Sequence, residues 1–383
     1  MSPKSFHINV PDAELERLYQ KLDAATFLNE LGSAGWDMGV PLSEIKRLTA
    51  YWRSGFNWRE QEAKLNTQFR QFIVPVSVEG YDGLEVHYLH HISETPGAIP
   101  LLFIHGWPGS FIEATKIIPL LTSGDGDKPA FSVIAPSLPN FGFSSPVKNR
   151  GFGLNQYAEA LHNLMTSLGY KDYVIQGGGW GSFIARTMAQ KYPTHTKAIH
   201  LNFIPMRFPM PWQNPLFFLQ NLLPIPFSSA RKSYLGSVLT YLTKGSGYML
   251  QQSTRPQTLG YALHDSPIAL LSWIYDKLHS WTDNYRWTDD EILTWEDGTL
   301  QVSMSKPATA DVKVGVVQFK AELMRYPLSW ASLLGYSVRA TEYPKGGHFA
   351  AWEVPELLAS DLREFFGKGG QAYGVVEGKA GFD

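Results

Sequence analysis

The sequence has no cysteine, no long apolar run and no strong net charge. Without cysteine, the chain cannot form a disulfide, a thiolate nucleophile or a zinc–thiolate site. No window approaches the roughly 18 uninterrupted apolar residues of a membrane-spanning helix, and residues 1–7 lack the apolar region of a signal peptide. The net charge of −2 gives no electrostatic reason to expect nucleic acid or an anionic membrane as a partner. We therefore expect a cytoplasmic protein that neither spans a membrane nor binds nucleic acid.

The most informative absence is that of a side chain at position 179. Residues 177–182 are Gly-Gly-Gly-Trp-Gly-Ser, between an expected buried strand at 172–176 and an expected helix at 180–192. A sharp turn from strand to helix is the setting of a nucleophile elbow, whose middle residue carries the attacking side chain. Gly179 stands at that middle position, so covalent attack from there is impossible. Ser182 is no substitute, because it lies three residues further on, inside the helix.

What the chain does have is a large supply of aromatic and other apolar residues. Hydrophobic residues make up 44% and charged residues 18%, which indicates an ordinary globular protein with a substantial core. Aromatic residues reach 14%, enough to build that core and also to line a large apolar pocket. A length of 383 residues allows one large domain with an inserted subdomain, or two modest ones.

Short apolar strands alternate with helices along much of the chain. Helical sequence at 11–25 and on to about residue 70 precedes a strand pair near 72–78 and 84–90. The alternation that follows is strand 100–104, helix 111–121, strand 131–135, helix 155–168, strand 172–176, helix 180–192 and strand 197–203. It fails between about 205 and 305 and resumes with strands 312–317 and 337–341 and helix 355–366. This order predicts an α/β protein with a mostly parallel sheet and helices on both faces.

The same pattern divides the chain into parts. They are an N-terminal segment at 1–95, the first part of the core at 96–204, a helical lid at 205–308, the second part of the core at 309–368 and a flexible tail at 369–383. The aromatic run at 205–227 is most simply lid core, with pocket lining as the alternative for a few of its members. The tail is expected to be mobile because it is rich in glycine.

Ligands of open α/β sheets bind at the carboxyl ends of the strands, where three loops carry candidate residues. The loop His105-Gly106-Trp107-Pro108 follows strand 100–104, and its backbone N–H groups would form an oxyanion hole. The glycine elbow at 177–182 is the second loop. The third holds His348, after the last strand of the sheet.

Glu322 lies 26 residues before His348 and would orient its imidazole. Glu353 and Glu342 are competing partners, and His348 itself is alternatively a structural relic. The order of elbow, acid and histidine is that of the α/β-hydrolase triad.

Together these motifs resemble the epoxide hydrolases of the microsomal type. The resemblance covers residues 5–368 and rests on Phe56 to Glu62, His105 to Pro108, Pro136 to Ser144 and the Gly-Gly-His-Phe-Ala-Ala loop at 346–351. It implies an α/β-hydrolase fold with an N-terminal wrapping segment and an inserted helical lid. In that family an elbow aspartate attacks the epoxide carbon, and a His–acid pair then activates water against the resulting ester. Two lid tyrosines donate hydrogen bonds to the epoxide oxygen.

The resemblance assigns roles to individual residues of this chain. The base is His348, its acid is Glu322 and one lid tyrosine is Tyr248, for which ordinary packing is the alternative. The oxyanion and pocket residues are His105, Gly106, Trp107, Pro108 and Trp180. Three departures stand out: Gly179 replaces the aspartate, residues 295–311 contain no tyrosine where the second one belongs, and Asn140 replaces a glycine.

With the nucleophile missing and the base retained, we expect non-covalent acid–base chemistry on an apolar small molecule. His348 would abstract a proton while Tyr248 and the loop amides stabilise an oxyanion, in isomerisation, cyclisation, elimination or dehydration. Secondary metabolism, perhaps better specified as fungal by the family analogy, is the expected context; no metal or cofactor is expected, and a homodimer stays open. The alternatives are direct epoxide opening by water activated at His348, a hydrolase inactivated at Gly179 by nature or by engineering, and a binding protein without catalysis.

Overall fold

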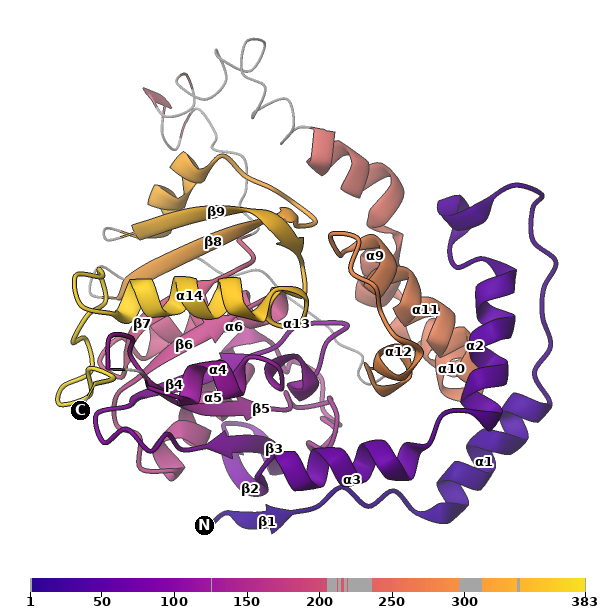
Figure 1. Ribbon diagram of the computed structural model, residues 1–383, viewed down its shortest axis with the longest axis horizontal. Coiled ribbons are helices and arrows are strands. Elements are labelled where there is room, and N and C mark those ends of the chain that lie inside the picture. The colour runs from indigo at the N-terminus through magenta and orange to yellow at the C-terminus, as the bar shows by residue number, and fades with distance from the viewer. Residues whose placement is uncertain are drawn as a thin grey trace.

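One nine-stranded sheet forms the centre of the molecule (Figure 1). The computed structural model describes residues 2–124, 126–204, 212, 215–216, 219, 236–295, 312–335 and 338–382. The strands are β1 (Lys4–Phe6), β2 (Gln71–Val78), β3 (Tyr81–His91), β4 (Ile99–Ile104), β5 (Phe131–Pro136), β6 (Tyr173–Gly177), β7 (Thr196–Leu201), β8 (Lys313–Ala321) and β9 (Val338–Gly347). They lie side by side in the order β1-β2-β3-β5-β4-β6-β7-β8-β9.

Helices cover the sheet and one of its ends. The α-helices are α1 (Asp12–Asp23), α2 (Leu42–Ser54), α3 (Trp58–Gln68), α4 (Ile118–Thr122), α5 (Leu154–Ser167), α6 (Trp180–Lys191), α9 (Gly247–Thr254), α10 (Pro256–Asp265), α11 (Pro267–Ser280), α12 (Asp289–Trp295), α13 (Ala350–Glu353) and α14 (Pro355–Phe366). Helices α4 and α14 pack together, as do α5 and α6. In the described ranges, no helix is long and apolar enough to cross a lipid bilayer.

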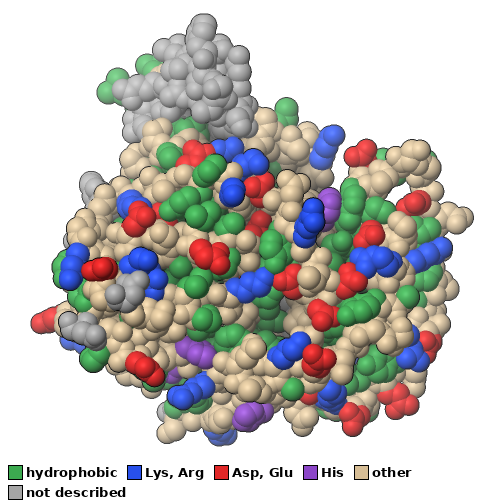
Figure 2. Space-filling view, in the orientation of Figure 1, with side chains coloured by type: hydrophobic (Ala, Val, Ile, Leu, Met, Phe, Trp, Pro, Cys, Tyr) green, Lys and Arg blue, Asp and Glu red, His purple; other side chains and the backbone are tan. Residues whose placement is uncertain are grey.

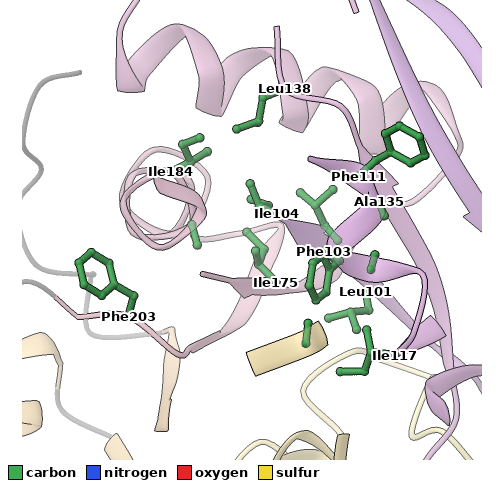
Figure 3. Packing of buried hydrophobic residues seen from close by; sticks show 14 of the residues in the cluster. Leu101, Phe103, Ile104, Phe111, Ile117, Ala135, Leu138, Ile175, Ile184 and Phe203 are labelled. Carbon is green, nitrogen blue, oxygen red and sulfur yellow. The ribbon is translucent and has the colours of Figure 1, made fainter. Parts of the chain in front are cut away.

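The strands from β5 to β9 pair in parallel, while β1, β2 and β3 extend the sheet in antiparallel fashion through β5. Every residue of β4, β5 and β6 is buried, as expected for strands covered on both faces. Figure 3 shows Leu101, Ile104 and Ile175 packed beneath Ile184 of α6. This is the α/β-hydrolase fold, so the fold predicted from the alternation of strands and helices is confirmed.

The N-terminal helices lie against the helices that precede β8 (Figure 1). The Trp36 ring stacks on the His279 imidazole of α11 at 3.6 Å between ring centroids. Lys21 of α1 forms an ion pair with Asp265 of α10, with 2.8 Å between Nζ and Oδ1. Charges of both signs are interspersed over the face in Figure 2, where exposed pairs of this kind contribute little stability. Ring packing is therefore the stronger link between these two parts of the chain.

Residues 236–295, here called the α9–α12 segment, are mainly helical in the part of the lid range that the structure describes continuously. Two hydrogen bonds join this segment to loops at the carboxyl end of the sheet. The Trp295 indole N–H donates to the Pro108 carbonyl at 2.8 Å, and the His348 N–H donates to the Trp281 carbonyl at 2.9 Å. Most of the aromatic run at 205–227 lies outside the described residues.

The single helix expected at 111–121 is two shorter pieces. A 3-10 turn, η2 (Phe111–Ala114), is followed by α4, whose second residue is Pro119. Proline has no N–H to donate to an earlier turn and fits the first turn of a helix, so a new helix begins there.

The expectation of a flexible tail needs correction. Residues 367–382 form a series of turns, in which Ala372 and Val376 are buried. Gly381 accepts a hydrogen bond from the Ala130 N–H at 2.7 Å and donates one to the Gly97 carbonyl at 2.6 Å. Glycine-rich composition is shared by mobile tails and by packed turns, and here these contacts hold the turns against the core.

Deleting residues 368–383 should lower the free energy of unfolding by about 3 kcal/mol. The deletion removes two backbone hydrogen bonds of about 1 kcal/mol each and the burial of Val376. Urea unfolding followed by tryptophan fluorescence measures the difference. Val376→Ala should show part of the loss, while Glu377→Ala, at an exposed neighbouring position, should leave the midpoint unchanged. An unchanged midpoint after the deletion would contradict a packed tail.

Candidate active site

Four loops meet where parallel strands of the sheet end. The loop from His105 follows β4, Gly179 follows β6, Glu322 follows β8 and His348 follows β9. Parallel neighbours bring their carboxyl ends to the same edge, and this is why residues up to 243 positions apart in the chain come together.

The backbone at Gly179 has φ 48° and ψ −124° and is the N-cap of α6. This conformation strains any residue with a side chain, which favours glycine but is also the geometry of a nucleophile elbow. A Cβ atom at this position would lie 3.2 Å from His348 Nε2 and 3.3 Å from Gly106 Cα. A side chain at residue 179 would thus project toward the imidazole.

The loops after β4 and β6 touch each other backbone to backbone. A Cβ atom on Gly106 would lie 2.7 Å from the Trp180 nitrogen, so no side chain fits there. Trp180 begins α6, and the first N–H groups of a helix have no acceptor within the helix. The N–H groups of the first turn of α6 and of the loop 105–108 are therefore gathered beside the Gly179 position, where they can stabilise negative charge on an oxygen.

His348 and Glu322 form a buried hydrogen bond, with 2.6 Å between Nδ1 and Oε1. Their relative exposures are only 5% and 6%, and Glu322 Oε1 also accepts from the Leu323 N–H. With Nδ1 donating to the carboxylate, the other ring nitrogen, Nε2, presents its lone pair toward the Gly179 position.

Two opposing effects set the pKa of His348. Burial lowers it, but the charge of the Glu322 carboxylate and the hydrogen bond to it outweigh burial, so that the pKa lies above the ordinary value of 6.5. The buried Glu113 carboxyl also acts on His348 in the same direction as Glu322. Such an imidazole is a stronger base than an unperturbed one.

Neither competing carboxylate reaches the His348 ring. Glu353 accepts hydrogen bonds from the backbone N–H groups of Phe349 and Asp283, and it serves to close the loop after β9. Glu342 pairs with Arg325 instead. The structure therefore selects Glu322 among the three candidates for contact with His348.

Aromatic rings enclose the imidazole. The rings of Phe203 and Trp281 approach His348 edge-on, with centroids at 5.2 and 5.3 Å. Tyr248 stacks on Trp107 at 4.9 Å with an interplanar angle of 12°, and it also contacts Trp281. Within the described residues, the buried Trp107 indole N–H has no hydrogen-bond partner. The surroundings of His348 are thus apolar, with a few polar groups set among the rings.

His105 and Pro108 hold the first loop in place. The His105 Nδ1 bonds to the Gly106 carbonyl at 2.9 Å, while its Nε2 accepts from the Leu138 N–H at 3.1 Å. Burial lowers the pKa of His105 to about 4, so the ring is neutral at physiological pH. With both nitrogens occupied, His105 has a structural task.

Two further polar residues beside the site escaped the sequence analysis. Burial raises the pKa of the Glu113 carboxyl to about 8, and it lies in η2, within electrostatic reach of His348. No pattern in the sequence singles it out. Tyr241 hydrogen-bonds to Tyr248, with 3.0 Å between the hydroxyl oxygens. Its spacing of seven residues from Tyr248, two helical turns, is a signal that the sequence did contain.

The remaining sequence expectations have mixed outcomes. Ser182 donates to the Gly179 carbonyl at 2.7 Å and is fully buried in α6, in agreement with its reading as a helix hydroxyl. Asn140 adopts φ 71°, a left-handed conformation that asparagine tolerates better than most residues. The tyrosine-free stretch lies, beyond Trp295, outside the described residues.

Comparison with known proteins agrees with this arrangement. Residues 3–114 match the family model of the epoxide hydrolase N terminus, and residues 99–240 match that of the alpha/beta hydrolase fold. Epoxide hydrolase 1 of Sus scrofa is 32% identical, in a match that covers 96% of this chain and 89% of the relative.

Two solved structures extend the likeness over nearly the whole chain. Juvenile hormone epoxide hydrolase from Bombyx mori has a TM-score of 0.83 at 28% identity and covers 94% of this chain and 93% of its own. Aspergillus niger epoxide hydrolase has a TM-score of 0.79 at 29% identity, over 94% and 95%. The chain therefore belongs to the epoxide hydrolase family, as its motifs predict.

Proposed function

We propose that this member of the epoxide hydrolase family carries out non-covalent acid–base chemistry on an apolar small molecule, as an isomerase, cyclase or lyase. The observation that carries the proposal is the position of His348. Its Nδ1 is held by Glu322 at 2.6 Å, and its Nε2 faces the side-chain position of Gly179, which has no carboxylate. A base is present without the nucleophile whose ester it would hydrolyse.

In this proposal, His348 Nε2 takes a proton from the substrate. The backbone N–H groups of Trp107 and Trp180, together with the Tyr248 hydroxyl, stabilise the negative charge that develops on a substrate oxygen. Glu322 stays ionised and stabilises the imidazolium that forms. Since no alkyl-ester intermediate exists, no water is consumed, and the product of isomerisation or cyclisation has the mass of the substrate.

The surroundings of the base support an apolar substrate. The rings of Phe203, Trp281 and Trp107 exclude water, which strengthens hydrogen bonds to a charged oxygen. The relatives named above are epoxide hydrolases, so an epoxide is the first substrate class to test. The α9–α12 segment, tied to the loops by Trp295 and Trp281, would act as a lid, in keeping with an enzyme of secondary metabolism.

One observation favours a second candidate, an epoxide hydrolase inactivated at a single residue. The backbone of Gly179 keeps φ and ψ values of a nucleophile elbow, and its missing Cβ points at His348. An aspartate placed there would meet the base directly. The two candidates differ in whether the rest of the site still supports ester formation and hydrolysis.

The products formed from a panel of epoxides separate these functions. The panel contains styrene oxide, cyclohexene oxide and an epoxy fatty-acid ester, and mass spectrometry distinguishes isomers from diols. We expect the natural sequence to give isomers of unchanged mass, with the rate reduced about 100-fold or more in His348→Ala, because the base is lost.

Gly179→Asp serves as the comparison in the same assay. Diol formation by Gly179→Asp alone, with no product from the unaltered chain, would replace the proposal with an inactivated hydrolase. Diols from the unaltered chain that depend on His348 would indicate direct attack by water. Binding without turnover, unaffected by His348→Ala, would indicate a binding protein.

The rate of isomer formation should fall as the pH decreases through a midpoint above 6.5. The neutral imidazole is the active base, and Glu322 raises the pKa of His348 above that value, so the active form is lost on the acid side. Glu322→Gln should move this midpoint below 6.5, since burial, which lowers the pKa, then predominates.

The control is Glu342→Gln, which alters a carboxylate paired with Arg325 away from the imidazole and should leave the profile unchanged. Titration of the His348 ring protons by NMR gives the same midpoint independently of turnover. A midpoint that Glu322→Gln does not shift would contradict the electrostatic role of Glu322.

A further inference from the structure

Two tyrosine hydroxyls meet above the carboxyl end of the sheet. Tyr248 lies in the first turn of α9, and Tyr241 begins a π-helical turn, η4 (Tyr241–Gly245), directly before it. The hydroxyl oxygens are 3.0 Å apart, within hydrogen-bonding distance. π-Helical turns are rare and occur often at functional sites. The pair therefore has more than the usual claim to a role in the site.

Ring contacts place this pair beside His348. Tyr248 stacks on Trp107 and packs against Trp281, whose ring in turn contacts the imidazole at 5.3 Å. The Tyr248 hydroxyl is also close enough to Glu322 to be affected by its charge. Tyr241 is 8% exposed and meets the site through Tyr248.

The hydrogen bonds of the pair leave one proton without a good acceptor. Two hydroxyls have two protons, and a bond between them uses one. Within the described part of the chain, the other contact recorded for either hydroxyl is Met249 Sδ, 3.8 Å from the Tyr241 oxygen, and a thioether is a weak acceptor. A ligand oxygen placed against the pair would satisfy the second proton.

Both phenols remain neutral donors throughout the physiological range. Burial raises the pKa of Tyr241 and that of Tyr248 above the ordinary value of 10. Hydrogen bonds in a chain polarise one another, so a Tyr248 hydroxyl that accepts from Tyr241 donates more strongly to a third group.

We propose that Tyr241 completes a paired phenol donor with Tyr248 for a substrate oxygen, and that the substrate therefore carries an epoxide, ether or carbonyl oxygen next to the atom that His348 deprotonates. This inference rests on the proposed function and specifies its substrate. Tyr241 acts through Tyr248 as a positioning residue. It supplies a phenol from the sequence just before α9, in a chain whose residues 295–311 contain no tyrosine.

Two ligands of nearly equal shape test the pair without knowledge of the natural substrate. Acetophenone has a carbonyl oxygen and ethylbenzene has none, and dissociation constants for both are measured by fluorescence quenching or calorimetry. The ratio of the two constants isolates the contribution of the oxygen. A change that merely loosens packing weakens both ligands together and leaves this ratio unchanged.

Tyr241→Phe and Tyr248→Phe keep the rings and remove one hydroxyl each. We expect the preference for acetophenone over ethylbenzene to fall about five-fold in either variant, the effect of one neutral hydrogen bond. The double variant should fall by less than the product of the two, because the hydroxyls act together. Tyr261→Phe, on an exposed face of α10, is the matched control and should change nothing.

The outcomes separate the inference from the function on which it rests. A lower preference in Tyr248→Phe with an unchanged preference in Tyr241→Phe overturns the paired donor and leaves the proposed function standing. Equal weakening of both ligands in Tyr241→Phe shows a packing role and also overturns it. If the unaltered protein binds neither ligand, the apolar small-molecule site itself is wrong, and both proposals fall.

Discussion

The contact between the loops after β4 and β6 is the constraint on which the rest of the site depends. The backbones come so close that a Cβ on Gly106 would lie 2.7 Å from the Trp180 nitrogen. This approach gathers backbone N–H groups from both loops and fixes the turn at Gly179 at the start of α6. It also directs the side-chain position of residue 179 toward His348. The parallel strands supply the edge, and the glycines allow the backbones to meet there.

Around that contact, the site has a basic side and a donating side. His348 is held by Glu322 within a cage of aromatic rings, which makes it a strong base although it is buried. Facing it are the amides of the two loops and the hydroxyls of Tyr241 and Tyr248, neutral groups that favour negative charge on an oxygen. Replacing a carboxylate by Gly179 removes covalent attack but leaves both sides in place. Proton transfer is the chemistry that such an arrangement retains.

Local patterns explain which expectations were met and which were not. Alternating apolar strands and helices predict the parallel sheet because burial on both faces requires apolar runs, and β4, β5 and β6 satisfy it at every residue. Helix 111–121 was predicted too long because its apolar positions continue across the turn before Pro119. The tail was predicted to be mobile from its glycine content, whereas Gly381 is held by Ala130 and Gly97.

The sequence by itself determined the fold class, the family and the empty nucleophile position, because each depends on periodicity or on a motif read along a short stretch of chain. It also named His348 and Glu322, but it left Glu353 and Glu342 as equal candidates for the acid. Only the tertiary structure decided among them, placed Glu113 near the base and joined Tyr241 to Tyr248 beside Trp107 and Trp281. The physical reason is that a hydrogen bond requires its two atoms to lie about 3 Å apart. Such distances between remote segments are fixed by how the strands and helices pack, and no local pattern encodes them.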